Sequence, residues 1–107
     1  MAQQESERVK KLEALLEKQG NDPFLLYGLG MEYKKAGDLA KALEYLQRTV
    51  QADAGYCYAY YQRGQVHELA GDVEAARSAY REGIEAALKK GDEHARSEIQ
   101  GALEMIQ

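Results

Sequence analysis

The feature that most constrains the fold is an internal repeat with a period of 34 residues. The segment 29–38, Leu-Gly-Met-Glu-Tyr-Lys-Lys-Ala-Gly-Asp, returns in altered form at 63–72 with its glycines and its Ala-Gly-Asp triplet in register. Tyr27 and Tyr61 keep the same offset, as do Ala42 and Ala76, without a gap. A period of this length is typical of stacked supersecondary units, none of which can bury its apolar face alone. We therefore expect a short solenoid.

Apolar residues recur at helical spacing along most of the chain, and no segment shows the alternation of a β-strand. Short turns separate these segments, and a Gly-Asp pair occurs at 37–38, 71–72 and 91–92, where glycine ends one helix and aspartate caps the next. The expected helices cover residues 4–19, 23–36, 39–52, 56–70, 73–90 and 92–107. We expect an all-α fold in which about six antiparallel helices form one domain, residues 1–107.

Two glycines, Gly30 and Gly64, fall inside expected helices at the same place in the period. Glycine in a helix interior costs about 1 kcal/mol relative to alanine. Because the chain repeats this cost, we expect a neighbouring helix to approach closely over a residue that has no side chain.

Composition and charge exclude several classes of partner and location. The net charge is −4 and the basic residues are scattered, so the chain has no electrostatic footprint for nucleic acid or an anionic membrane. The N-terminus lacks a basic region followed by an apolar run, and no apolar run approaches the roughly 20 residues that cross a bilayer. We expect a cytoplasmic protein that binds neither nucleic acid nor a membrane.

The residues that carry catalysis or metal binding are sparse. His67 and His94 lie far apart without a neighbouring ligand, and a single cysteine, Cys57, excludes an internal disulfide. Cys57 begins a helix, where a thiol pKa can fall, but its aromatic surroundings favour a packing role. No Ser/His/Asp set, paired carboxylates or phosphate-binding loop is present. We expect no catalytic residue, no cofactor and no metal.

The repeat resembles the tetratricopeptide repeat, whose helix–turn–helix units have a period of 34 residues. The resemblance rests on Leu29-Gly30-x-x-Tyr33 followed by Gly37, Ala42 and Leu46, and more loosely on Gly64, His67, Gly71, Ala76 and Tyr80. Leu26 and Tyr60 stand where the family usually has tryptophan or another bulky residue. The chain departs from the family where Ala54 and Leu88 replace the usual proline. The resemblance divides the chain into an N-terminal helix from a truncated repeat (4–20), two repeats (23–54 and 57–90) and a C-terminal capping helix (92–107).

The resemblance implies a right-handed superhelix whose first helices line a concave groove that receives a peptide or helix of a partner protein. The groove-facing positions carried over from the family are Phe24, Tyr27, Met31 and Lys34 in the first repeat, and Tyr58, Tyr61, Gln62, Gln65 and Glu68 in the second. A subclass of the family grips a C-terminal carboxylate with Lys, Asn and Arg at such positions. Because Tyr, Met and Gln stand there instead, we do not expect a carboxylate clamp.

The tyrosines of the second repeat are expected to divide between packing and binding. Tyr60 should pack between the helices of its own repeat, and Tyr56 should pack near the junction with the previous one. Tyr58 and Tyr61, together with Tyr27, should border the groove, since tyrosine is enriched where proteins bind partners.

Two functional hypotheses follow from these observations, and no residue supports the third class, an enzyme. The first is a non-enzymatic protein–protein interaction scaffold that binds a peptide or helix in a tyrosine-lined groove. The alternative is a structural or assembly module that forms a homo-oligomer or part of a larger helical complex. The alternative is motivated by the small number of repeats and by apolar residues that the end helices are expected to expose, namely Val9, Leu15, Ile99 and Leu103.

Overall fold

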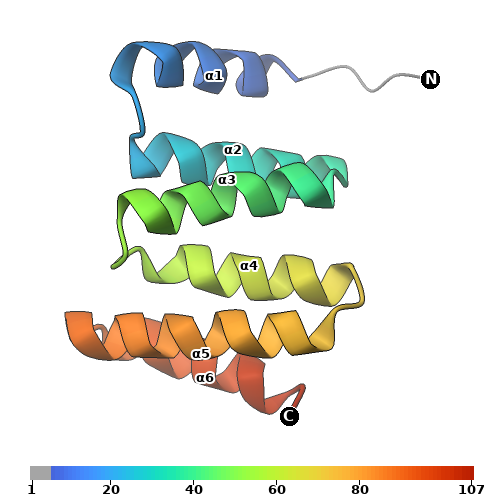
Figure 1. The fold of residues 1–107 in the computed structure, drawn as a ribbon, viewed down its shortest axis with the longest axis vertical. Helices are drawn as coiled ribbons and strands as arrows, with labels where there is room; N and C mark the ends of the chain where they lie inside the picture. The colour runs from blue at the N-terminus through green and yellow to red at the C-terminus, as the bar shows by residue number, and fades with distance from the viewer. Residues whose placement is uncertain (1–5) are drawn as a thin grey trace.

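The computed structural model describes residues 6–107, and this part of the chain contains helices but no strands (Figure 1). The elements are α1 (Glu7–Gln19), α2 (Pro23–Ala36), α3 (Leu39–Ala52), α4 (Cys57–Leu69), α5 (Val73–Lys90) and α6 (Glu93–Glu104). Helices α2, α3 and α5 begin and end at the expected residues. Helix α4 is one residue shorter than expected at each end. The sixth helix was expected to continue to residue 107, but α6 ends three residues earlier.

The expected start of the first helix at residue 4 is wrong, although residues 4 and 5 themselves lie outside the described part of the chain. Ser6 has an extended backbone, and its side chain accepts a hydrogen bond from the N–H of Val9 at 3.1 Å. Serine is a preferred N-cap because its hydroxyl satisfies one of the N–H groups that a helix start leaves without a partner. The helix therefore begins at Glu7.

The turns between helices use the glycine and aspartate pairs as expected. Gly37, Gly71 and Gly91 have φ angles of +84°, +82° and +76°, a region that favours glycine. The aspartate after each glycine accepts a hydrogen bond from the backbone N–H three residues later, at 3.0 to 3.2 Å. Asp22 caps α2 in a similar way, and Pro23 occupies its first turn. Each such cap stabilises a helix by about 1 kcal/mol.

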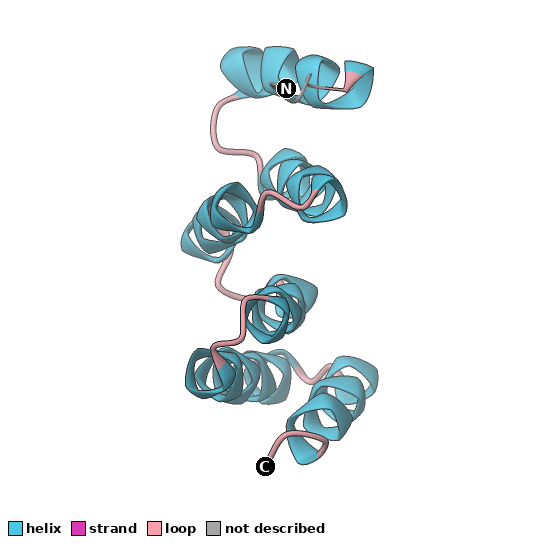
Figure 2. Ribbon diagram, turned by 90° about the vertical axis from the view of Figure 1, so that its right-hand side faces the viewer, coloured by secondary structure: helices cyan, strands magenta, loops and turns pink. Residues whose placement is uncertain are grey.

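The molecule measures 37 × 31 × 18 Å along its principal axes. The helices stack as antiparallel pairs along the longest of these axes (Figure 1). Seen end-on, α2, α4 and α6 lie along one side of the stack and α3 and α5 along the other (Figure 2). Helix α1 covers the N-terminal end and packs against α2. The arrangement is a short all-α solenoid, and α2, α4 and α6 together form a continuous surface that we call the α2–α4–α6 face.

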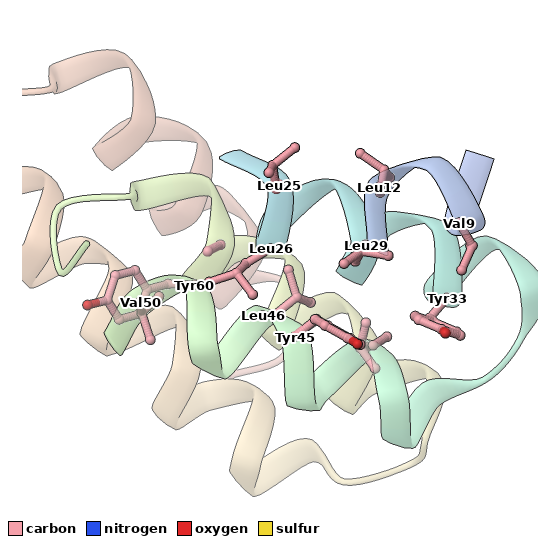
Figure 3. Close-up of a cluster of buried hydrophobic side chains, with 13 residues drawn as sticks. Val9, Leu12, Leu25, Leu26, Leu29, Tyr33, Tyr45, Leu46, Val50 and Tyr60 are labelled. Carbon is pink, nitrogen blue, oxygen red and sulfur yellow. The ribbon is translucent and has the colours of Figure 1, made fainter. Parts of the chain in front are cut away.

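Two apolar clusters form the core, and α4 contributes to both. The first unites side chains of α1, α2, α3 and α4 around the fully buried Leu26, Leu29 and Leu46 (Figure 3). The second lies between α4, α5 and α6 around the fully buried Tyr80 and Ile99. Because the clusters share α4, the stack is held together from one end to the other.

The helical glycines permit close packing, which confirms the expectation for Gly30 and Gly64. A Cβ atom at Gly30 would lie 2.8 Å from Cγ of Leu46, and one at Gly64 would overlap the ring of Tyr80. Gly83 plays the same part, since a Cβ there would lie 2.8 Å from Cβ of Tyr60. The glycines thus allow side chains of a neighbouring helix to pack directly on the helix backbone.

The end helices hide most of the apolar residues that they were expected to expose. Val9, Ile99 and Leu103 are buried, so the expectation is wrong for these three, and only the fourth residue, Leu15, is exposed, at 41%. The reason is that each end helix turns its apolar stripe inward, α1 onto α2 and α6 onto α5. Within residues 6–107, no helix is both long enough and apolar enough to cross a membrane.

Candidate functional site

The side chains expected to line a groove form one stripe on α2 and one on α4. All of them are half-buried except Phe24, which is 71% exposed. Their spacing of three and four residues places each set on a single side of its helix. The hydrogen bonds and ring contacts on this face show which of these residues the fold brings together.

Gln62 joins the two stripes. Its Oε1 accepts a hydrogen bond from Nζ of Lys34 at 2.7 Å, and its side chain also hydrogen-bonds the Tyr27 hydroxyl. The ring of Tyr27 lies 5.0 Å from that of Tyr56, measured between centroids. Burial, reinforced by Tyr56, raises the pKa of Tyr27. The side chains of Tyr27 and Lys34 are therefore held in place by residues of the next helix pair.

The four tyrosines between residues 56 and 61 differ in how they pack. Tyr60 is buried and donates its hydroxyl hydrogen to the carbonyl of Ala54 at 2.9 Å, while Tyr56 packs against the preceding helix pair. Tyr58 and Tyr61 are half-buried, with ring centroids 6.3 Å apart and planes at 81°. This edge-to-face geometry is a favourable one for aromatic pairs.

Gln65 and Glu68 serve the core as well as the surface. Nε2 of Gln65 donates to the Tyr80 hydroxyl at 3.0 Å, and that hydroxyl donates in turn to Glu68. Tyr80 is fully buried, and burial together with the Glu68 hydrogen bond raises its pKa. These two residues satisfy the one polar group of a core tyrosine, so part of their role is structural.

Helix α6 adds residues to the face that sequence reasoning did not identify. The Tyr58 hydroxyl donates to Oε1 of Glu98 at 2.5 Å, and Nε2 of His94 lies 3.0 Å from the same oxygen. The Glu98 hydrogen bond is the main cause that raises the pKa of Tyr58 to about 12, and Asp92 contributes. Tyr58 and Glu98 are 40 residues apart in the sequence, so no local spacing relates them. Only the packing of α6 shows that Glu98 is the neighbour.

Cys57 and His67, which could in principle take part in chemistry, are packed among other side chains of the fold. Cys57 is buried, and burial raises its thiol pKa, so the helix start does not activate it. His67 is half-buried, and burial lowers its pKa. Among residues 6–107, no three His, Cys, Asp or Glu side chains lie close enough together to hold a metal ion.

A cleft of about 420 Å³ lies on the other side of the molecule, between α1 and α3. Arg48 crosses it, with its guanidinium 5.1 Å from the centroid of the Tyr45 ring and a hydrogen bond to Asn21 at 3.3 Å. The cleft does not follow from the sequence pattern, because it depends on how α1 sits relative to α3.

Comparison with known proteins identifies the family. The model of the tetratricopeptide repeat matches residues 25–56 and again residues 58–90. The chain belongs to the tetratricopeptide repeat family. A TPR repeat-containing protein of Pseudomonas aeruginosa is 36% identical over 91 residues, which are 85% of this chain and 87% of that protein.

Solved structures share the fold. A tetratricopeptide repeat domain protein from Salinibacter ruber superimposes with a TM-score of 0.73 at 32% identity, covering 79% of this chain and 94% of that one. A protein from Bordetella parapertussis gives a TM-score of 0.81 at 27% identity, covering 95% and 89%. PcrH, solved in complex with the chaperone-binding region of PopD, gives 0.85 at 20% identity, covering 92% and 74%. At that identity the PcrH likeness concerns the fold alone.

Proposed function

We propose that this tetratricopeptide repeat protein is a non-enzymatic, cytoplasmic scaffold that binds a peptide or helix of a partner protein in a tyrosine-lined groove on the α2–α4–α6 face. In this proposal residues 23–54 and 57–90 are the two repeats. The flanking segments 4–20 and 92–107 complete a single domain, of which residues 4 and 5 lie outside the described part. The single observation that carries the proposal is the row of half-exposed tyrosines along this face.

The contacts of these tyrosines support a binding role. Tyr27 is held by Gln62 and Tyr56, and Tyr61 contacts the rings of Tyr58 and Tyr80. A side chain that is already ordered loses little conformational entropy when a partner arrives, so more of its contact energy contributes to affinity. Tyrosine also combines a large apolar ring with a hydroxyl that can hydrogen-bond a peptide backbone.

The decisive experiment compares partner capture by the wild-type chain and by a Tyr27→Ala/Tyr61→Ala variant, with quantification by mass spectrometry. The matched control is Gln47→Ala/Gln51→Ala, which changes two exposed side chains of α3 on the other side of the stack. Circular dichroism first establishes that all three proteins are folded. We expect a partner that wild type and control retain and that the tyrosine variant loses by tenfold or more, since hot-spot tyrosines typically contribute about 2 kcal/mol or more. Equal capture by all three proteins would contradict the proposal.

The assembly hypothesis has one observation in its favour, which is that several large apolar side chains are exposed. Phe24 at the start of α2 and Met105 after α6 are 71% and 85% exposed, and Leu15 of α1 is 41% exposed. A second copy of the chain would cover such residues. Sedimentation velocity over a wide concentration range tests this alternative, and a monomer at every concentration would remove it.

A further inference from the structure

The part of the face between α4 and α6 combines aromatic rings with carboxylates. Tyr58 and Tyr61 meet edge to face, and the Tyr58 hydroxyl holds Oε1 of Glu98 at 2.5 Å. The Glu98 side chain is still 46% exposed, so its carboxylate faces solvent as well as the tyrosine. Asp92 adds a second negative charge that acts on Tyr58.

The opposite end of the face carries positive charge. Lys34 and Lys35 lie in the last turn of α2, and Lys35 is exposed. At the α4–α6 end His94 lies 3.0 Å from Glu98 and is itself 82% exposed, so it can swing away when a cation binds, whereas two other basic side chains are engaged elsewhere. Lys90 donates to the carbonyl of Gly55 at 3.2 Å, and Arg96 pairs with Glu93 at 2.6 Å. The last turn of α2 therefore contributes two lysines to this side of the molecule, and α6 contributes the carboxylate of Glu98.

We propose that the partner segment places one arginine or lysine side chain against Tyr58, Tyr61 and Glu98. This inference rests on the proposed function, because it specifies the chemistry of a ligand for the same face. The faces of tyrosine rings attract cations, and a carboxylate accepts charge-assisted hydrogen bonds from them. Arginine fits best, because its planar guanidinium can stack on a ring while it hydrogen-bonds a carboxylate.

The rest of the face determines what surrounds this cation. Phe24, Tyr27 and Met31 offer apolar contact area over α2, while Lys34 and Lys35 disfavour a second basic residue there. The expected ligand is thus a segment that carries apolar side chains at one end and a basic side chain at the other. An acidic side chain opposite Glu98 would be repelled, so the site also selects against negatively charged segments.

The first part of the test is selection from a displayed library of random peptides of about twelve residues. The library is selected in parallel on the wild-type chain and on the Tyr27→Ala/Tyr61→Ala variant. We expect peptides that depend on the two tyrosines and that share one position occupied by arginine or lysine. Face-dependent peptides without a shared basic position would overturn this inference and leave the proposed function standing. If no peptide depends on the tyrosines, both are overturned.

The second part measures the contribution of Glu98 with one selected peptide and its analogue in which citrulline replaces the basic residue. We expect Glu98→Gln to weaken binding of the basic peptide by about fivefold at low salt, and binding of the citrulline peptide by less than twofold. Glu85→Gln is the matched control, since it makes the same change on an exposed position of α5. Because the Glu98 side chain is half-exposed, its replacement should leave the fold intact, which circular dichroism verifies. Equal losses for the two peptides would overturn the inference.

Discussion

At the scale of single residues, the effect of a substitution depends on the atoms that surround the position. Gly64 and Gly101 illustrate this. Both lie inside helices, where an alanine would be favoured by intrinsic propensity. The fully buried ring of Tyr80 packs over Gly64. At Gly101, no atom of residues 6–107 outside the local helix backbone lies within 4 Å of an added Cβ. The same substitution therefore has opposite effects at the two positions.

We expect Gly64→Ala to lower the free energy of unfolding by about 2–3 kcal/mol, because the added methyl group overlaps a rigid ring in a closed core. Gly101→Ala should raise it by about 0.5–1 kcal/mol, because it removes backbone freedom from the unfolded chain without a clash. Urea denaturation followed by circular dichroism measures both values. A Gly64→Ala variant as stable as wild type would show that α4 and α5 can separate at little cost.

A second prediction at this scale concerns the reactivity of Cys57, because burial raises the pKa of its thiol. The thiolate is the reactive form, so a raised pKa leaves less of it at any given pH and moves the onset of reaction upward in pH. We expect the native protein at about pH 8 to react with a disulfide reagent at least tenfold more slowly than the urea-unfolded chain. Equal rates across the pH range would show that Cys57 is accessible and not shifted.

At the scale of helices, α6 acts as a structural cap and also forms part of the α2–α4–α6 face. Its apolar residues Ala95, Ile99 and Leu103 recur every four positions and are buried. Its side toward α4 carries Glu98, which meets Tyr58. One short helix thus completes the second apolar cluster and adds a carboxylate to the face.

The structural part of this double role predicts that Ile99→Ala lowers the free energy of unfolding by about 2–4 kcal/mol, because it leaves a cavity under a fully buried side chain. Met105→Ala, at a residue that is 85% exposed, is the control and should change it by less than about 0.5 kcal/mol. Thermal and urea unfolding curves provide the comparison. A small effect of Ile99→Ala would mean that α6 is dispensable for the second cluster.

At the scale of the whole molecule, stability passes between neighbouring helices, as in any array of repeats. Within the described part of the chain, helices α2 to α5 each pack against at least two other helices, whereas α1 packs against α2 alone. The N-terminal end of the stack is therefore held by a single interface, formed mainly by Val9, Leu12 and Leu16.

This asymmetry predicts that amide hydrogens of α1 exchange at lower opening free energies than those of α4, which contributes to both apolar clusters. Leu12→Ala should accelerate exchange in α1 while leaving α5 unchanged, since the two helices share no interface. Hydrogen exchange followed by NMR resolves each helix. Equal protection of α1 and α4 would instead indicate that the chain opens only as one cooperative unit.

The amino-acid sequence alone was enough to predict the helices, their order along the chain and the resemblance to the family. The period of 34 residues, the Gly-Asp pairs and the helical spacing of apolar residues are local signals, and each acts within a few turns of backbone. For this reason α2, α3 and α5 could be predicted to the residue, and the role of Gly30 and Gly64 could be inferred from their place in the repeat. A missed local signal, the Ser6 cap, accounts for the wrong start of α1.

Only the tertiary structure decided which side chains meet across helices. It buried Val9, Ile99 and Leu103, tied Gln65 and Glu68 to Tyr80, and placed Glu98 beside Tyr58 although 40 residues separate them. The contact of Glu98 with Tyr58 in particular does not follow from the period, because the longer α5 shifts α6 out of register with the repeat. Local spacing determines which side of a helix a residue occupies, whereas its neighbours depend on how whole helices pack, and that is settled by the combined burial of distant segments.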